Sequence, residues 1–502
     1  MSPWSELNSM SLSNEHSPLL PSSKLRPTCA LILSTILTCF GICIPLGFGT
    51  VLINVPSQVF QEFVNQSYFS QTHSYLVRSE LKALWSFIVA SFMLGGLVGC
   101  LGVSFVAEKI GRKWGLVLAS VIGISGCLFG SLSYFLNSFE LFAVGRMVSG
   151  FSGGIGSTIL SVYLSEISPV HLRGSSGCFL EIFICVGNLI STVVSLPSLL
   201  GSYTMWAYLL CIPCLGYLPL LLVLPFLPKT PKYIRSKMAV RQLEPSLVRS
   251  LRFYHGSQAS LSQAVQQFDR ELEMVSTNWL QVIKSAVFRK SLTMVVAIRA
   301  AHILTGITVM KYFSTEIFKN LQFGDKPAMY NSIGLCLVHV VVSIFGVFLV
   351  ERMGRRPLLV YGLFGTLICV IVYMVASLIV DFNPEQQWAS YLSLIALYTH
   401  TFIFSVGPGS VAWLIVPELT PQTIRSTVTS VGTFVTWTTN LIVTATFLPL
   451  TNAIGNFSFL LLIVPLGTLT AYLFRKLPET KNKPVDVIVR EMITDVDTMS
   501  LS

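Results

Sequence analysis

The chain has 502 residues, of which 52% are hydrophobic and 11% are charged, and its formal net charge is +10. Soluble domains carry about 25% charged residues, so this composition excludes an ordinary soluble protein. Apolar runs of about 20 residues recur, and each is long enough to cross the roughly 30 Å core of a bilayer as a helix. The composition therefore predicts an all-α membrane protein whose surroundings are the lipid bilayer.

We expect about twelve transmembrane helices in two sets of six. Their approximate limits are 28–54, 83–105, 115–136, 140–165, 176–198, 205–227, 291–318, 327–350, 357–380, 390–416, 424–450 and 455–475. These limits divide the chain into five segments. They are an N-terminal tail (1–27), a first six-helix bundle (28–227), a linker with short helices (228–290), a second six-helix bundle (291–476) and a C-terminal tail (477–502).

The distribution of Lys and Arg predicts the orientation in the membrane. The linker is strongly basic, which places it in the cytoplasm together with both termini, so the positive net charge indicates no nucleic-acid partner. Residues 55–82 then lie outside, and they contain the sequon Asn65-Gln-Ser67, which predicts glycosylation of Asn65. We expect residence in the plasma membrane, with an endosomal or lysosomal membrane as the alternative.

The N-terminal tail contains one candidate sorting signal. The segment Glu15-His-Ser-Pro-Leu19-Leu20 has the form of an acidic dileucine motif that a sorting adaptor binds. Two leucines in a polar tail can also occur by chance, and both interpretations stay open.

Two signatures occur once in each half of the chain. The first is a glutamate followed by a basic turn, with Glu108 before Gly111-Arg112 and Glu351 before Gly354-Arg355. The second is a Glu-x-Ser/Thr-Pro segment followed by arginine, with Glu166 before Arg173 and Glu418 before Arg425. The repetition in the same order predicts an internal duplication. In a membrane protein it favours a transporter whose site lies between the halves.

Further motifs extend this pattern from about residue 28 to 482. They are Asn54-Val-Pro56, Gly145-Arg146, Tyr163-Leu-Ser-Glu166, Pro228-Lys-Thr-Pro231, Gly407-Pro-Gly409 and Pro478-Glu-Thr-Lys481. The ordered set resembles the sugar-transporter family of the major facilitator superfamily, specifically the animal facilitative glucose transporters. The resemblance implies two pseudo-symmetric six-helix bundles and secondary transport by alternating access.

The resemblance also implies a role for the repeated charged residues. They are expected to form a conformational salt-bridge network made of Glu108, Arg112, Glu166, Arg173, Glu351, Arg355, Glu418 and Arg425. Each carboxylate is expected to face a guanidinium nearby in sequence, because such pairs gain from bidentate geometry. The network would clamp the halves at the cytoplasmic side while the site faces outward. The alternative is that these residues only set the topology.

A binding pocket follows from the same resemblance. The implied substrate-binding residues are Glu181, His302, Thr308, His339, Trp413 and Asn440, and the implied gate residues are Tyr312, Phe313 and Phe404. The family binds hexose hydroxyls with amides, which both donate and accept hydrogen bonds, but most aligned amides are replaced here. The Gly407-Pro408-Gly409 segment predicts a break in the tenth span, with unwound backbone lining the cavity.

The replacements introduce ionisable groups at membrane depth. Glu181, His302 and His339 are functional candidates because the bilayer makes idle charges costly, and they could bind hydroxyls or a proton. We expect Arg299 to face a neighbouring helix. We expect the aliphatic chain of Lys311 to carry its ammonium group outward, away from the cavity. If both instead reach the cavity, an anionic solute becomes the alternative.

Cysteine usage and ligand spacing predict neither a metal nor a cofactor. The 11 cysteines lie almost all inside apolar runs, where we interpret them as small buried hydrophobic residues. No spacing typical of a metal centre is visible, so no metal site and no cofactor are expected.

The leading functional prediction is a secondary transporter, facilitative in mechanism, for a hexose or related small polar solute. The alternatives are a proton-linked or organic-anion (urate-like) carrier and a non-transporting solute sensor. An enzyme is not expected, because the chain carries no phosphate-binding loop and no nucleophile–base arrangement.

Overall fold

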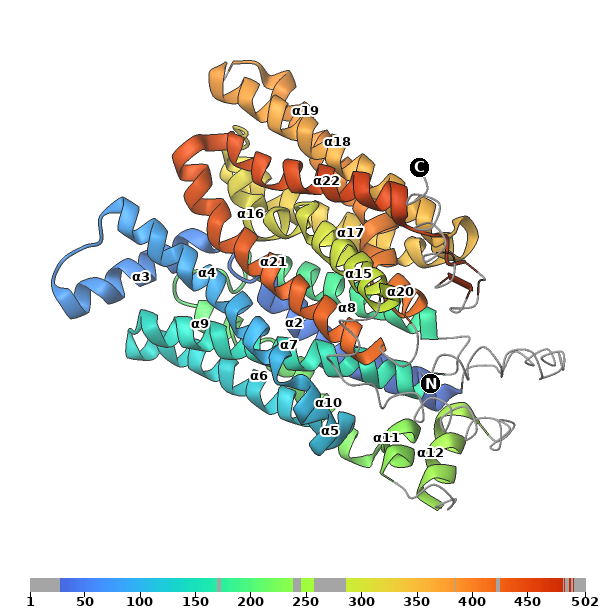
Figure 1. Ribbon diagram of the computed structural model, residues 1–502. Coiled ribbons are helices and arrows are strands. Elements are labelled where there is room, and N and C mark those ends of the chain that lie inside the picture. The colour runs from blue at the N-terminus through green and yellow to red at the C-terminus, as the bar shows by residue number, and fades with distance from the viewer. Residues whose placement is uncertain are drawn as a thin grey trace.

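The computed structural model describes residues 28–168, 173–237, 245–256, 286–383, 385–420, 425–481, 483, 487–488 and 491. Figure 1 shows a bundle in which the long helices run roughly side by side. The residues of the dileucine motif, Glu15, Leu19 and Leu20, lie outside the described residues.

The first half of the bundle contains the spans α2 (Cys29–Val51), α4 (Arg78–Leu101), α6 (Gly111–Leu136), α7 (Phe139–Ile167) and α8 (Arg173–Val194). Its sixth span is divided into α9 (Trp206–Leu209), α10 (Cys214–Val223) and η2 (Leu224–Phe226). Shorter helices are α3 (Ser57–Thr72), α5 (Val103–Lys109), α11 (Pro231–Ser236) and α12 (Pro245–His255). Pro213 precedes α10 at the division, where a residue without an N–H group ends a helix readily.

The second half contains α15 (Ala286–Leu304), α16 (Ile307–Asn320), α17 (Asp325–Met353), α18 (Arg355–Phe382) and α19 (Gln387–Phe404). It continues with η3 (Ser405–Gly409), α20 (Ser410–Leu419), α21 (Arg425–Ile454), η4 (Gly455–Phe459) and α22 (Leu460–Lys476).

The number of spans agrees with the expectation. Among the described residues, 11 helical stretches are long and apolar enough to cross a membrane, and the last is Thr427–Lys476 with 50 residues. A straight helix of that length would extend about 75 Å, more than twice the thickness of the hydrocarbon core. Instead the chain turns at η4 between α21 and α22 (Figure 1), which makes this stretch two spans.

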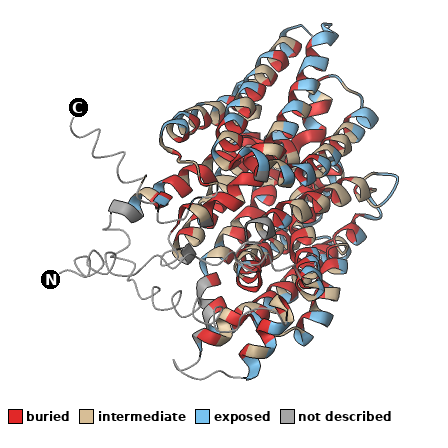
Figure 2. Cartoon of the chain, turned by 90° about the vertical axis from the view of Figure 1, so that its right-hand side faces the viewer, coloured by how far each residue is buried: buried red, intermediate tan, exposed pale blue. Residues whose placement is uncertain are grey.

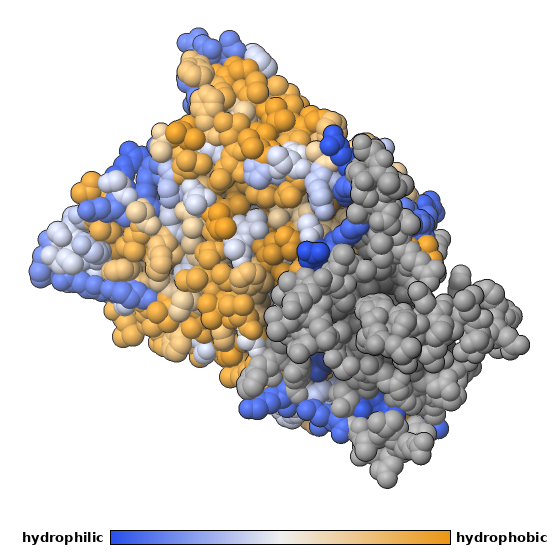
Figure 3. Space-filling view, viewed as in Figure 1, coloured by the Kyte–Doolittle hydropathy of each residue, from blue (hydrophilic) through white to orange (hydrophobic). Residues whose placement is uncertain are grey.

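The surface is apolar where a soluble protein would be polar. Leu222, Phe226 and Phe382 are 71%, 86% and 76% exposed. Figure 3 shows orange side chains over most of the visible flank, with blue ones gathered towards its ends. Buried residues line the helix faces that point into the bundle (Figure 2). Soluble monomers rarely expose such extended apolar surface, so these faces contact lipid and the chain is a multi-pass membrane protein.

The tenth span corrects one prediction. Gly407-Pro408-Gly409 does not unwind the helix, because η3 is a wider π-helical turn that connects α19 directly to α20. The turn tolerates Pro408 because hydroxyls satisfy nearby carbonyl oxygens: the Ser410 Oγ donates to the Ser405 carbonyl at 2.7 Å. A side chain at Gly407 would lie 2.5 Å from the Leu358 carbonyl oxygen, so the glycine lets α18 approach closely.

Both basic turns begin with a glycine whose φ is positive. Gly111 and Gly354 have φ values of +86° and +95°, and they begin the turns that start α6 and α18. Only glycine adopts this region without strain, which explains why the repeated signature contains it in both halves. We name the end of the bundle that carries Gly111 and Gly354 the Gly-Arg end, and the opposite end, where α3 lies, the α3 end.

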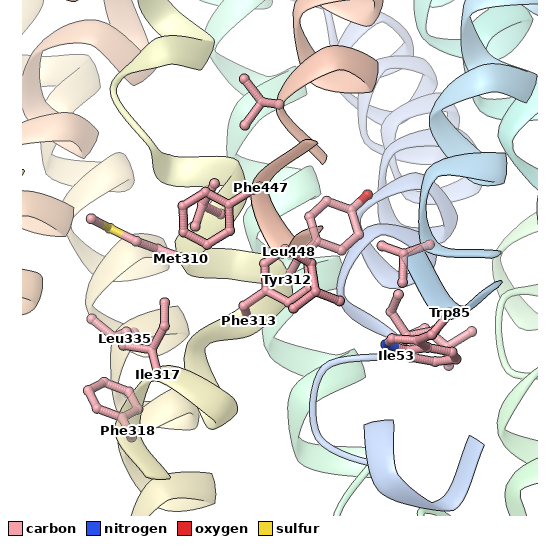
Figure 4. Close-up of a cluster of buried hydrophobic side chains, with 14 of the residues drawn as sticks. Ile53, Trp85, Met310, Tyr312, Phe313, Ile317, Phe318, Leu335, Phe447 and Leu448 are labelled. Carbon is pink, nitrogen blue, oxygen red and sulfur yellow. The ribbon is translucent and has the colours of Figure 1, made fainter. Parts of the chain in front are cut away.

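The buried core is shared between the halves at the α3 end and divided at the Gly-Arg end. One cluster joins Ile53 and Trp85 of the first half to Phe313 and Phe447 of the second, and Figure 4 shows part of it. A second cluster, which includes Leu116 and Tyr163, combines residues of the first half with Tyr254 of α12 in the linker. A third belongs to the second half, apart from Cys178 of α8. The apolar packing therefore holds the halves together mainly at the α3 end.

A polar bridge accompanies this packing. The Asn54 side chain, beyond the end of α2, donates to the Ser314 hydroxyl at 2.7 Å and accepts from the Thr315 N–H at 3.2 Å. Ser314 in turn donates to Ser332 at 2.9 Å. These residues are buried, and no sequence argument had assigned Asn54 a contact across the halves. The structure is thus closed at the α3 end.

The sequon residue Asn65 lies within α3 and not in an irregular loop. Its side-chain oxygen accepts a hydrogen bond from the Leu76 N–H at 3.1 Å, and the hydroxyl of Ser67 is buried against the Asn137 carbonyl at 2.6 Å. Glycosylation of Asn65 stays a prediction.

The Asn54 bridge leads to a prediction about the closed end. Replacing Asn54 by alanine leaves buried partners unsatisfied, at a cost of about 1–3 kcal/mol to the closed arrangement. We expect N54A to shift the population towards molecules open at the α3 end. Spin labels on exposed Ser74 and Lys326 should then report longer distances in double electron–electron resonance. The control is S70A, because the Ser70 hydroxyl donates to the Gln66 carbonyl and accepts from the Asn137 side chain, both in the same half. Unchanged distances in N54A would contradict the bridge.

Candidate functional site

A cavity of about 120 Å³ lies between the two halves. The first half contributes Leu46, Thr50, Met93, Ser157, Thr158, Ser161, Glu181 and Ile184. The second half contributes His302, Ile303, Ile307, Thr308, Lys311, Tyr312, Phe404, Trp413, Thr433, Thr436, Trp437 and Asn440. Aromatic rings, aliphatic side chains and hydroxyls therefore surround one space at the junction of the halves.

The structure brings the six expected binding residues together around this cavity. Five of them line it directly, namely Glu181, His302, Thr308, Trp413 and Asn440. The sixth, His339, is buried beside it, with its Nε2 3.5 Å from the Glu181 Oε1. Thr308 donates to the Asn440 side-chain oxygen at 2.7 Å, which holds both groups at the wall. Their role in binding stays a prediction.

The expected gate residues divide into two groups. Tyr312 and Phe404 line the cavity. Phe313 does not, since it stacks on Phe447 with ring centroids 5.9 Å apart inside the shared core at the α3 end. Tyr312 lies on the face of α16 that carries Thr308 and Lys311, whereas Phe313 is turned about 100° further round the helix, towards α21.

Several polar atoms at the cavity have no partner among the described residues. They are both ring nitrogens of His302, the hydroxyl of Tyr312 and the indole nitrogen of Trp413. The ring of His302 lies 5.2 Å from that of Phe404 and 6.5 Å from that of Trp413, measured between centroids. Buried polar groups normally have hydrogen-bond partners, so this group is suited to a ligand rich in hydroxyls.

Lys311 corrects the sequence-based expectation that it extends outward. It lines the cavity, and its Nζ is 4.0 Å from the Glu181 Oε1. The helix geometry explains this: α16 starts after Gly306, and Thr308, Lys311 and Tyr312 then share one face at i, i+3 and i+4. The facing carboxylate compensates the ammonium charge.

Arg299 lies next to the cavity rather than in its lining. Its guanidinium carbon is 4.1 Å from the centroid of the Trp413 ring, and its aliphatic stem packs near Gly432 of α21. It therefore faces a neighbouring helix, as expected, and it also fixes the plane of Trp413 through a cation–π contact.

Each half carries the same polar triad at the Gly-Arg end. In the first half, the Arg112 Nε donates to Glu166 at 3.0 Å and the Thr230 hydroxyl donates to the other carboxylate oxygen at 2.6 Å. In the second half, Arg355 contacts Glu418 at 3.2 Å and Thr480 donates to it at 2.5 Å. A further Arg112 nitrogen reaches the Ala107 carbonyl, and the matching Arg355 nitrogen is directed at the Val350 carbonyl.

The observed ion pairs differ from the expected ones. We expected carboxylates to face arginines nearby in sequence, whereas Arg112–Glu166 and Arg355–Glu418 join different helices of the same half. The side chains of the other four members lie outside the described residues, namely Glu108, Arg173, Glu351 and Arg425. A clamp between the halves stays a prediction.

The sequence analysis missed the two threonines. The signal was present, because Pro-x-Thr follows the last span of each half, in Pro228-Lys-Thr230 and Pro478-Glu-Thr480. The middle residue of the segment is Glu479 in the second half and Lys229 in the first, so its charge is opposite. Glu479 accepts hydrogen bonds from the N–H groups of Arg355 and Arg356 at 3.0 and 3.2 Å, so its carboxylate caps the N-terminus of α18. Lys229 stands at the matching position of the first half.

The environment of the second triad shifts the pKa values of two glutamates, Glu418 and Glu479. Burial raises the pKa of Glu418 above its ordinary value, although Thr480 and Arg355 oppose the shift. For Glu479, burial acts in the same direction, but donation by the N–H groups of Lys481, Arg355, Arg356 and Thr480 outweighs it and lowers the pKa. Glu479 is therefore held as a charged cap, while Glu418 depends on its partners to stay ionised.

The fold matches known structures closely. The proton:xylose symporter XylE bound to 6-bromo-6-deoxy-D-glucose superposes with a TM-score of 0.75 at 20% identity, covering 91% of this chain and 98% of that chain. The partially occluded inward-open form of the xylose transporter XylE from E. coli gives a TM-score of 0.74 at 18% identity, covering 91% and 100%. The chain therefore has the fold of these structures, with a cavity between its two halves.

Sequence relatives identify the family. A family model described as "Sugar (and other) transporter" matches residues 34–491. Solute carrier family 2, facilitated glucose transporter member 4 of Mus musculus is 32% identical over 473 residues, covering 92% of this chain and 91% of the relative. Member 5 of Equus caballus is 27% identical over 486 residues, covering 97% and 96%. The chain belongs to the sugar transporter family.

The repeated triads predict a stability effect. T480V removes a hydrogen bond to a charged carboxylate, so we expect a loss of about 1.5 kcal/mol or more near neutral pH. The hydroxyl holds the Glu418 pKa down, so its stabilising effect is present above that pKa and is lost as the pH falls through it. Thermal unfolding in detergent should show a lower Tm for T480V at neutral pH and a shrinking difference in acid.

The control for this measurement is T446V. The Thr446 hydroxyl donates to the Ile442 carbonyl of its own helix and is exposed, so the loss of this threonine should leave the Tm nearly unchanged. T230V tests the matching position of the first half. Equal Tm values for T480V, T230V and T446V would show that the triads do not stabilise the fold.

Proposed function

We propose that this chain carries a hexose or a related small polyol across a membrane by alternating access, in the manner of a facilitative carrier. The observation that carries the proposal is the cavity between the halves, where polar atoms of His302, Tyr312 and Trp413 have no partner within the described part of the chain and lie beside aromatic faces. A sugar ring presents hydroxyls around its edge and C–H groups on its faces, so it matches both kinds of surface.

The arrangement of the cores supports the proposed mechanism. The halves share packing at the α3 end, while their cores are separate at the Gly-Arg end, so the structure corresponds to one of the two states that alternating access requires. Rocking of one half against the other would break the Asn54 bridge and expose the cavity at the α3 end. In major facilitator transporters such motion occurs around a fixed central site.

We assign the orientation from charge. The Gly-Arg end faces the cytoplasm, as do both terminal segments and the linker 228–290, and α3 with Asn65 faces outward. The membrane we propose is the plasma membrane, with retrieval to endosomes if an adaptor binds Glu15, Leu19 and Leu20.

A proton-linked carrier is the second candidate. Glu181 lies 3.5 Å from His339 and 4.0 Å from Lys311 at the cavity, and such ionisable groups inside a membrane often transfer protons. An organic-anion carrier is less well supported, because the Lys311 charge is compensated by Glu181.

Uptake into proteoliposomes tests the solute and the coupling. We expect labelled glucose, fructose or inositol to enter with saturation kinetics, and labelled urate not to enter. Uptake that is equal at acidic and neutral external pH supports the facilitative mechanism, and uptake driven by an inward proton gradient supports the second candidate. Binding of solute without any uptake would contradict transport and favour a sensor.

Side-chain replacement tests the site. We expect E181Q to raise the KM for the transported solute by roughly tenfold or more, since a charge-assisted hydrogen bond is lost. W413A should reduce kcat/KM by a similar factor through loss of the aromatic face. The matched controls are E62Q and W388A, which alter exposed residues remote from the cavity. If both cavity variants behave like their controls, the assigned site is wrong.

A further inference from the structure

Three metal-ligating side chains meet where the halves touch beside the cavity. Glu181 and Cys185 belong to α8 of the first half, and His339 belongs to α17 of the second. The Glu181 Oε1 lies 3.5 Å from the His339 Nε2 and 3.6 Å from the Cys185 Sγ. The three donor atoms all lie within 4.8 Å of one another.

Helix geometry explains why the cluster forms. Glu181 and Cys185 are four residues apart, so they lie on one face of α8, and that face meets α17. His339 and Ser343 have the same spacing on α17, and the Ser343 hydroxyl lies 3.9 Å from the Cys185 Sγ. Glu181, Cys185 and His339 come from positions up to 158 residues apart, so no local spacing in the sequence could show the set.

Two of the three separations between ligand atoms fit a tetrahedral zinc ion. Zinc bonds of about 2.0 Å to nitrogen or oxygen and 2.3 Å to sulfur place neighbouring ligand atoms about 3.3–3.8 Å apart. The two measured separations from Glu181 fall within that range. A second observation is that His339 is only 3% exposed, yet its Nε2 has no hydrogen-bond partner among the described residues. An unsatisfied imidazole nitrogen directed at a carboxylate is suited to a cation between them.

We propose that Glu181, Cys185 and His339 bind a divalent cation of the zinc class, and that the bound ion ties α8 to α17. A thiolate, an imidazole and a carboxylate favour Zn²⁺ over Mg²⁺ or Ca²⁺, which select oxygen ligands. The thiol of Cys185 releases its proton to solvent when the metal binds. A water molecule or the hydroxyl of Ser343 completes the coordination.

Because the ligands come from both halves, the ion restrains their relative movement. This consequence rests on the proposed alternating-access function, and it makes Zn²⁺ an inhibitor of transport. Lys311, 4.0 Å from the same carboxylate oxygen, competes with the cation for Glu181. Removal of the Lys311 charge therefore strengthens metal binding.

Metal binding is measured on the purified full-length chain, without reference to transport. Isothermal titration with Zn²⁺ should show one site, and Cd²⁺ should produce the ultraviolet band of a metal–thiolate bond. C185S should weaken Zn²⁺ binding by at least about tenfold and abolish the band. The matched control is C369S, which replaces another buried cysteine in the second half and should bind like the wild type. Equal affinity and an unchanged band in C185S would overturn the site.

Two further measurements complete the test. K311Q should bind Zn²⁺ more tightly than the wild type, and a weaker affinity would contradict the proposed competition. In proteoliposomes, micromolar Zn²⁺ should reduce uptake by the wild type and by C369S but not by C185S. If Zn²⁺ binds through Cys185 but uptake is unaffected, the site stands and its restraint of the halves is wrong. If no solute is transported, the binding measurements still decide the metal site.

Discussion

The structure depends on one constraint: inside a bilayer, a charge or a hydrogen-bonding group must find its partner within the protein. The two polar triads satisfy this constraint, since Glu166 and Glu418 each bind one arginine and one threonine. Glu181 lies 3.5 Å from His339 and 4.0 Å from Lys311, so two groups that can carry positive charge face its carboxylate. At the cavity the constraint is left open at His302, Tyr312 and Trp413, whose polar atoms have no hydrogen-bond partner among the described residues.

The internal duplication is visible in the scaffold, whereas the cavity is lined asymmetrically. Both halves begin a long helix at a glycine with positive φ, and in both a Pro-x-Thr segment donates a hydrogen bond to a glutamate that also binds an arginine. The cavity shows no such repetition: most of its polar and aromatic groups come from the second half, while the first half supplies Glu181 and several hydroxyls. The repeated scaffold can therefore support the movement of both halves, while selectivity for the solute depends largely on residues of the second half.

Much of the fold could be predicted from the sequence, because apolar length, repeated turns and basic charge each depend on nearby residues. The cavity residues could be placed only through the family resemblance. What remained hidden needed three-dimensional information. The direction of Lys311 depends on the helix restart after Gly306, the separation of Tyr312 from Phe313 depends on helical phase, and the π-turn at Pro408 depends on hydroxyl partners. The contact of Asn54 with Ser314 spans 260 residues and leaves no local signal.

The shared apolar core at the α3 end has a thermal consequence. To open this end, the molecule must expose rings such as Trp85, Phe313 and Phe447 that are now buried together. Exposure of apolar surface to water raises the heat capacity, so the enthalpy of reorientation changes with temperature. The return of the empty carrier should therefore give a curved Arrhenius plot, and its rate should respond to cooling more sharply than the binding of solute does.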